Sequence, residues 1–276
     1  MNIAFCTCVQ IGLSCIEAVQ EIGGEFKLFL SLKDEKSKKK SGRIYLDDIS
    51  NKTRTPLVKI NHINDQECID ALKEHDIDWL FIIGWSQIAS KEVIEIPLKG
   101  TIGAHPTLLP VGRGRAAVPW AIIKGLDKTG VSFFKMDEGV DTGEILGQFE
   151  IPLTEKTDAS HLYSEVNEAH IKLIKKIWPS IQDGSLKGVI QDETLASYWD
   201  GRKPADGELS TDMNLLEVDR LVRATTKPYP GAFLNTGEGK IIFWKGSLEK
   251  VPGAKEFRFK DGLFFATETE FVLGSS

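Results

Sequence analysis

Short apolar runs alternate with amphipathic segments along the first half of the chain. Apolar runs bounded by polar residues are typical of strands, and apolar residues that recur every three or four positions are typical of helices. The predicted strands are residues 3–8, 26–32, 57–60 and 78–83, and the predicted helices are residues 12–22 and 65–75. The strand at 78–83 is continuously apolar, as expected where both faces of a parallel sheet are covered. This βαβα order predicts an α/β fold with a Rossmann-like, doubly wound, mostly parallel sheet.

The pattern changes toward the C-terminus. Two further strands (129–136 and 144–151) flank a turn rich in Asp and Gly, and a helix follows over 159–179. From about residue 207, one short helix precedes several closely spaced short strands, which predicts a small, β-rich, open-barrel-like domain. The expected domains are therefore residues 1–206, Rossmann-like and catalytic, and residues 207–276, small and β-rich.

Polar stretches carry weaker signals. Residues 33–54, which include Lys38-Lys39-Lys40, are expected to form a solvated loop. His161 and His170 lie on the helix predicted over 159–179, where exposed histidines are ordinary, and both are expected at the surface.

Composition narrows the class of protein. The net charge of −6 and pI near 5.5 argue against bulk electrostatic binding of nucleic acid. No apolar run approaches the roughly 20 residues of a membrane span. We expect no signal peptide, because the first residues go directly into a strand-like run. The four cysteines have no zinc-site spacing, so we expect buried thiols in a reducing cytoplasm and no metal.

Candidate chemistry gathers between residues 101 and 143. His105 ends an apolar run and precedes Pro106, and Asp141 lies in the Asp-Gly-rich turn. Ligands of doubly wound sheets bind beyond the carboxyl ends of the strands, so both residues are expected at one crevice with Gly84 and Trp85. An imidazole oriented by a carboxylate is a common device for moving a proton during acyl transfer.

The same residues carry a resemblance. His105-Pro106-Thr107-Leu108-Leu109-Pro110, Arg113-Gly114-Arg115 and Asp137-Glu138-Gly139-Val140-Asp141-Thr142-Gly143 together resemble the signature of the N10-formyltetrahydrofolate-dependent formyltransferases. Residues 202–208 and 228–233 are similar to the branch of that family acting on methionyl-tRNA or nucleotide-linked amino sugars. The resemblance covers most of the chain, from residue 1 to about 244.

The resemblance implies a site. His105 would stabilise the oxyanion or relay the proton, and Asp141 would orient its imidazole. N10-formyltetrahydrofolate would lie against two segments, which contribute Phe81, Ile83, Gly84, Trp85, Ile88, Asp137, Gly139 and Val140. The substrate would be held by four cations, Arg113, Arg115, Arg202 and Lys227.

One position departs from the family pattern. The family places an asparagine two residues before the histidine, and this chain has Gly103 there. Losing one oxyanion donor typically costs about 10²–10³ in rate. A neighbour such as Ser86 or Gln87, or a water, would donate this hydrogen bond instead. Otherwise the enzyme is slow, or the protein is an inactive descendant or an engineered variant. Restoring asparagine is expected to raise the rate if the rest of the machinery is intact.

Local charge favours one acceptor. Residues 207–276 contain nine Lys or Arg and ten Asp or Glu, whereas a platform for tRNA should be basic. A nucleotide-linked amino sugar of surface polysaccharide synthesis, such as lipopolysaccharide or O-antigen, needs only a few cations. The alternatives are a methionyl-tRNA formyltransferase and a catalytically silent folate- or nucleotide-sugar-binding protein. A homodimer through the small domain is a further expectation.

Overall fold

The structure is a computed structural model that describes residues 1–37 and 42–273. Contacts divide the chain into two compact units. The first unit comprises Met1–Arg113, Gly130–Glu150 and Asn167–Ser197, and the second Gly114–Thr129, Ile151–Val166 and Tyr198–Ser276. The expected boundary between residues 206 and 207 stays a prediction, since the second unit also includes two earlier segments.

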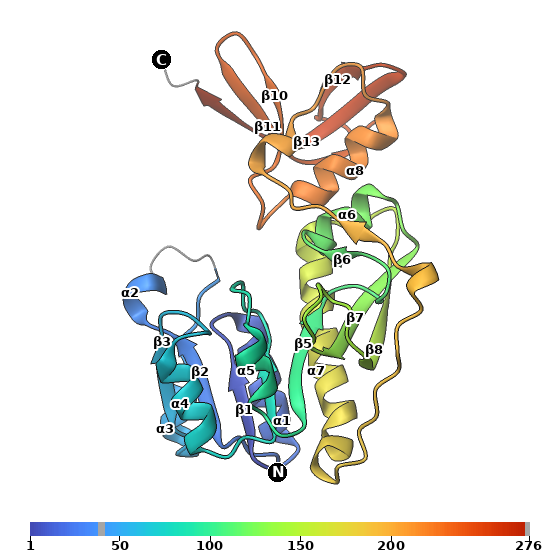
Figure 1. Ribbon diagram of the computed structural model, residues 1–276. Coiled ribbons are helices and arrows are strands. Elements are labelled where there is room, and N and C mark those ends of the chain that lie inside the picture. The colour runs from blue at the N-terminus through green and yellow to red at the C-terminus, as the bar shows by residue number, and fades with distance from the viewer. Residues whose placement is uncertain (38–41, 274–276) are drawn as a thin grey trace. The chain divides into compact units, whose positions relative to one another are not determined.

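A seven-stranded sheet forms the centre of the first unit, in the order β3-β2-β1-β4-β5-β7-β8 (Figure 1). The pairs from β3 through β5 are parallel, and β7 is antiparallel to β5. The strands are β1 (Ile3–Cys6), β2 (Leu28–Leu32), β3 (Leu57–Ile60), β4 (Trp79–Ile82), β5 (Gly100–His105), β7 (Lys128–Lys135) and β8 (Ile145–Pro152). The predicted mostly parallel α/β sheet is confirmed.

Helices cover both faces of this sheet. On one face, α4 and α5 close an aliphatic core over Leu30, Leu80 and Ile82. On the other face an aromatic cluster forms, in which the Phe81 ring lies 5.5 Å from Phe5 and 6.4 Å from Trp178 of α7. The helices are α1 (Gln10–Glu21), α2 (Asp34–Ser37), α3 (Asp47–Thr53), α4 (Gln66–Glu74), α5 (Lys91–Glu95), α7 (Ala159–Gln182) and the 3₁₀ turn η1 (Glu193–Leu195).

The second unit contains an antiparallel sheet in the order β10-β11-β13-β12 and confirms the predicted β-rich C-terminal part. Helix α8 packs on this sheet and on α6. A capping box starts α8, because the Asn214 side chain accepts from the Glu217 amide and the Glu217 carboxylate accepts from the Asn214 amide. The elements are α6 (Ala117–Ile123), β9 (Tyr198–Trp199), η2 (Pro204–Gly207), α8 (Leu215–Thr225), β10 (Ala232–Asn235), β11 (Gly239–Ser247), β12 (Lys255–Phe259) and β13 (Gly262–Leu273); β9 pairs with β6 (Arg113–Gly114).

Two sequence expectations were wrong. The stretch 33–54 contains α2 and α3, which are polar helices without an apolar stripe and therefore lack the periodic signal. The run at residues 38–40 lies outside the described residues. His170 is buried, with its ring 5.7 Å from Phe133 in the core, whereas His161 is exposed as predicted.

The four cysteines are buried, and all lie in the first unit. Burial raises the pKa of Cys15 far above its ordinary value and that of Cys68 to about 12, because a buried thiolate loses its hydration. Among the described residues, no helix combines the length and the apolar character that crossing a bilayer would require.

Candidate active site

His105 is the last residue of β5, and its position follows from the chain around it. Pro106 has no N–H and ends the ladder. The Ser132 hydroxyl, opposite His105 on β7, donates to the Thr107 carbonyl at 2.7 Å and accepts from the Leu109 amide at 3.0 Å. The loop after His105 is therefore attached to the neighbouring strand.

The structure brings His105 and Asp141 together. Nδ1 of His105 lies 3.5 Å from Oδ2 of Asp141, with the two side chains 8% and 16% exposed. Nε2 lies 2.7 Å from the carbonyl oxygen of Gly112. Because a carbonyl oxygen only accepts, Nε2 is the donor in this contact and carries a proton. The catalytic roles of both side chains remain predictions.

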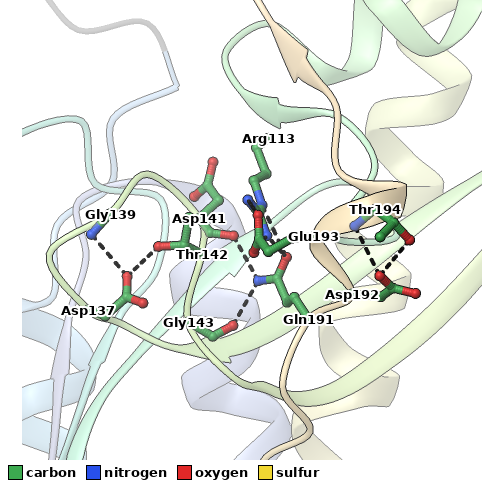
Figure 2. Close-up of polar contacts among 10 residues, drawn as sticks. All are labelled: Arg113, Asp137, Gly139, Asp141, Thr142, Gly143, Gln191, Asp192, Glu193 and Thr194. Carbon is green, nitrogen blue, oxygen red and sulfur yellow. Dashed lines mark hydrogen bonds and ion pairs between the residues drawn. The ribbon is translucent and has the colours of Figure 1, made fainter.

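Asp141 reaches His105 by a route that differs from the expected one. β7 runs antiparallel to β5, and its last residue, Lys135, pairs with Ile102, not with the carboxyl end of β5. The turn between β7 and β8 must therefore return toward His105. Asp137 holds this turn, since its Oδ1 accepts from the Gly139 amide at 3.0 Å and the Thr142 hydroxyl at 2.7 Å (Figure 2).

Backbone geometry constrains the same turn. Asp141 has a φ of 56°, in the left-handed region that residues other than glycine seldom adopt. A Cβ on Gly143 would lie 1.6 Å from the carbonyl oxygen of Lys135, so this position requires glycine. The turn is therefore a specific, constrained conformation.

Arg113 corrects a sequence prediction. It was expected to hold the substrate, but it is fully buried and its guanidinium is bound inside the first unit. It donates to Oε1 of Gln191 and makes a two-pronged contact with the Glu193 carboxylate at 2.9 and 2.7 Å. The Gln191 amide in turn donates to the carbonyls of Asp141 and Gly143 (Figure 2). Arg113 is therefore connected through Gln191 to the turn that carries Asp141.

Sequence reasoning missed Gln191 and Glu193. Gln191 lies in an irregular segment beyond α7 and Glu193 begins the 3₁₀ turn η1, and neither has apolar periodicity or a glycine pattern around it. The signal that could have found them is chemical: an arginine at the start of a glycine-rich loop needs acceptors when it is buried.

Gly103 lies on the same face of β5 as His105, two residues away. A Cβ there would lie 2.9 Å from Cζ of Phe134 and 3.1 Å from Cγ of Met136, so these two side chains occupy the space of the expected asparagine. The Gln87 amide is bound to Asn61 and Ile63, which does not support its expected role as a stand-in.

The residues expected to contact folate divide into two sets. Phe81 and Ile83 have buried side chains, and the Ile83 amide donates to the Cys6 carbonyl, which corrects their prediction as contact residues. The other six have accessible surface and remain predictions: Gly84, Trp85, Ile88, Asp137, Gly139 and Val140. Asp137 and Gly139 also line a cavity of about 620 Å³ beside α5, whose lining does not include His105 or Asp141.

The other three predicted substrate residues belong to the second unit. The Arg202 guanidinium lies 5.0 Å from the centre of the Trp120 ring and donates to the Asp206 carbonyl. The Arg115 guanidinium packs against Gly201, and Lys124 also lies over Trp120, at 5.3 Å. We call these residues — Arg115, Trp120, Lys124 and Arg202 — the Trp120 cation group.

Lys227 lies beside a different aromatic ring from the one in the Trp120 cation group. Its Nζ lies 5.4 Å from the centre of the Trp244 ring, and its carbonyl accepts from the Ser160 hydroxyl. Close by in sequence, the Tyr229 hydroxyl contacts the Tyr163 hydroxyl at 2.7 Å, and burial raises the pKa of Tyr229 above its ordinary value. Within residues 1–37 and 42–273, no group of three or more His, Cys, Asp or Glu side chains could hold a metal ion.

Comparisons with known proteins match both parts of the chain. The family model "Formyl transferase" matches residues 22–177, and "Formyl transferase, C-terminal domain" matches residues 202–273. A relative, the bifunctional polymyxin resistance protein ArnA of Wigglesworthia glossinidia brevipalpis, is 31% identical over 250 residues. That match covers 88% of this chain but only 37% of the relative.

Solved structures share the fold. A methionyl-tRNA formyltransferase from Clostridium thermocellum superposes with a TM-score of 0.67 at 20% identity, over 99% of this chain and 100% of that one. An N-formyltransferase from Helicobacter canadensis, in complex with folinic acid and dTDP-3-aminofucose, gives 0.67 at 16% identity, over 98% and 100%. Equal scores for these two proteins show a common architecture and do not distinguish their substrates.

Proposed function

Because the chain belongs to the formyltransferase family, we propose that it transfers the formyl group of N10-formyltetrahydrofolate to the amine of a nucleotide-linked amino sugar. The observation that carries this proposal is the contact between His105 and Asp141 within the family's motifs, at a distance of 3.5 Å. The Helicobacter canadensis enzyme, which is in complex with folinic acid and dTDP-3-aminofucose, supports the same pairing of a folate donor with a nucleotide-linked amino sugar.

The donor would lie along the accessible part of the predicted folate region. Ile88 is 86% exposed and Val140 60% exposed, and such apolar surface beside open backbone groups fits a flat heteroaromatic ring. When bound, N10-formyltetrahydrofolate supplies an activated formyl group. Gly84, which has a φ of 68°, allows the chain to leave β4 sharply and open this surface.

His105 and Asp141 would manage the proton of the attacking amine. Both imidazole nitrogens face acceptors: Nε2 contacts Gly112 at 2.7 Å and Nδ1 faces Asp141 at 3.5 Å. Because Nε2 carries the proton, the lone pair of the neutral imidazole is on Nδ1. The proton of the attacking amine would go to Nδ1, and the Asp141 carboxylate would stabilise the imidazolium that forms. Proximity of the held reactants supplies further acceleration, so the absence of an asparagine at position 103 would slow the reaction without abolishing turnover.

The acceptor proposal rests on charge. The Trp120 cation group offers one guanidinium group and one ammonium group at an indole ring, with the Arg115 guanidinium beside Gly201. This combination is suited to a diphosphate and a base. Residues 207–276 carry a net charge of −1, whereas phosphate neutralisation dominates the binding of a long polyanion. We therefore favour the nucleotide-linked sugar over tRNA.

A substrate screen tests the proposal. Nucleotide-linked 3-amino and 4-amino sugars are incubated with N10-formyltetrahydrofolate, and mass spectrometry detects the added formyl group. Initiator methionyl-tRNA is assayed in parallel at two salt concentrations. Turnover on an amino sugar supports the proposal. Turnover on tRNA alone overturns the acceptor, and tight binding of both ligands without any turnover favours the silent binding protein.

A further inference from the structure

The Arg113–Gln191–Glu193 cluster, in which Arg113 and Gln191 are buried and Glu193 is exposed, lies next to the candidate active site but contacts no reacting group. We infer that Gln191 is a positioning residue that holds Asp141 against His105, with Arg113 as its support. This inference rests on the proposed function, because it assigns Gln191 a role in the same formyl-transfer site.

Gln191 binds the turn at two backbone carbonyls, one belonging to Asp141 and one to Gly143. Its Nε2 donates to the carbonyl of Asp141 at 2.8 Å and to that of Gly143 at 2.7 Å, and the residue is 5% exposed. Both amide hydrogens are therefore used on the backbone of a single turn. That turn includes Asp141 at a φ of 56°, a conformation that persists only where its surroundings hold it.

Arg113 fixes which way the Gln191 amide points. Oε1 of Gln191 accepts from Nε and Nη2 of Arg113 at 3.1 and 2.8 Å. A guanidinium only donates, so the oxygen of the amide must face it and the NH₂ group must face the turn. The Glu193 carboxylate balances the buried charge of Arg113 at 2.7 Å.

The same pair also reaches the other catalytic candidate. Arg113 directly follows Gly112, whose carbonyl accepts from Nε2 of His105 at 2.7 Å. The contacts close a ring that runs from His105 through Gly112, Arg113, Gln191 and Asp141 back to His105. The Arg113–Gln191 pair therefore positions both His105 and Asp141. The distance between the imidazole and the carboxylate follows from these two positions.

The first test is a double-mutant cycle. Gln191→Glu keeps acceptors for Arg113 but cannot donate to the two carbonyls, so Asp141 should lose its position. We expect kcat to fall by roughly 10–100-fold, as when a residue that orients a catalytic group is removed, with the KM for the amine acceptor changed less than about twofold. In an Asp141→Asn background, where no carboxylate remains to be positioned, the same change should cost less than about twofold.

Asn2→Asp is the matched control, because the Asn2 amide also donates to two backbone carbonyls, those of His75 and Asp76, away from His105. It should leave kcat unchanged in both backgrounds. An equal loss of kcat from Gln191→Glu with and without the Asp141 carboxylate would overturn the inference. Gln191 would then stabilise the structure in general and would not position Asp141.

A second readout needs no substrate. The ¹⁵N NMR signal of His105 Nδ1 should move toward that of Asp141→Asn when Gln191 is replaced, and an unchanged signal in a folded variant would overturn the inference. Gln191→Met serves where Gln191→Glu does not fold. If no amino sugar is formylated, the proposed function fails, while this measurement still decides the role of Gln191.

Discussion

Two regions of the molecule handle positive charge in opposite ways. In the first unit, Arg113 is completely buried and its guanidinium is matched by the Glu193 carboxylate and the Gln191 amide. In the second unit, Lys124 and Arg202 lie over the Trp120 ring, and Arg202 donates to a backbone carbonyl. The hydrogen bonds of the Arg113 guanidinium are therefore made within the protein, whereas the Trp120 cation group can still bind an anionic ligand.

The contrast shows why a residue type alone does not define a role. Arg113 and Arg115 are two residues apart in one glycine-containing motif, and the sequence treats them alike. Their surroundings separate them: Arg113 is inaccessible and Arg115 is exposed. Burying a charged group is costly unless the group is paired and hydrogen-bonded. A fully buried arginine with matched acceptors therefore indicates a structural role and not a ligand-binding one.

The largest effect is expected in the first unit. His105→Asn should lower kcat by about 10²–10⁴, because it removes the group proposed to move the proton. Steady-state formylation assays measure this change. His161→Asn is the control, since His161 is exposed on α7, and it should keep full activity. A His105→Asn variant with the wild-type kcat would contradict the proposed catalytic role of His105 in the first unit.

Changes in the second unit should act on binding. Arg202→Ala is expected to raise the KM for the nucleotide-linked sugar by about 10-fold or more, the value of a charged hydrogen bond, and to leave kcat within about twofold. Arg258→Ala on β12 is the control, because this arginine belongs to the same unit and is exposed, whereas Arg202 is half-buried. A loss confined to kcat would contradict the assignment of the Trp120 cation group to ligand binding.

Gly103→Asn should not restore a faster enzyme by itself. Its Cβ would lie 2.9 Å from Phe134, which is buried, so the change overpacks the site at a cost of about 1–3 kcal/mol. Thermal unfolding should show a lowered midpoint. In Gly103→Asn combined with Phe134→Ala, the ring no longer blocks the amide, and a rate gain would show that an oxyanion donor is usable. A faster Gly103→Asn enzyme of unchanged stability would contradict the packing argument.

The smallest effect concerns pH. The hydrogen bond from Arg113 lowers the pKa of Glu193 below its ordinary value of 4.5. A carboxyl with a lowered pKa in the folded state stabilises the protein above its unfolded pKa and loses this contribution as the pH falls through the folded pKa. Glu193→Gln should therefore lower the unfolding midpoint at pH 7, and the difference from wild type should shrink as the pH falls below the ordinary value of 4.5. A difference that grows in acid would contradict the ion pair.

Periodic and local signals could be predicted from the sequence, and long-range polar contacts could not. β4 and α8 follow from an apolar run and a capping box, which are encoded within a few residues. The meeting of His105 and Asp141 was predicted, but on the assumption of two strands ending at one edge, whereas β7 is antiparallel. Gln191 lies 50 residues beyond Asp141 in an irregular segment, and only the folded chain shows that the two are in contact.

The positions of the cysteines have a practical consequence. All four thiols are buried in the first unit, and the second unit contains none. Alkylation by a thiol reagent requires the thiolate, which burial suppresses at Cys15 and Cys68. Labelling rates under native conditions would therefore act as a built-in reporter of the opening of the Rossmann-like unit alone, without any engineered probe.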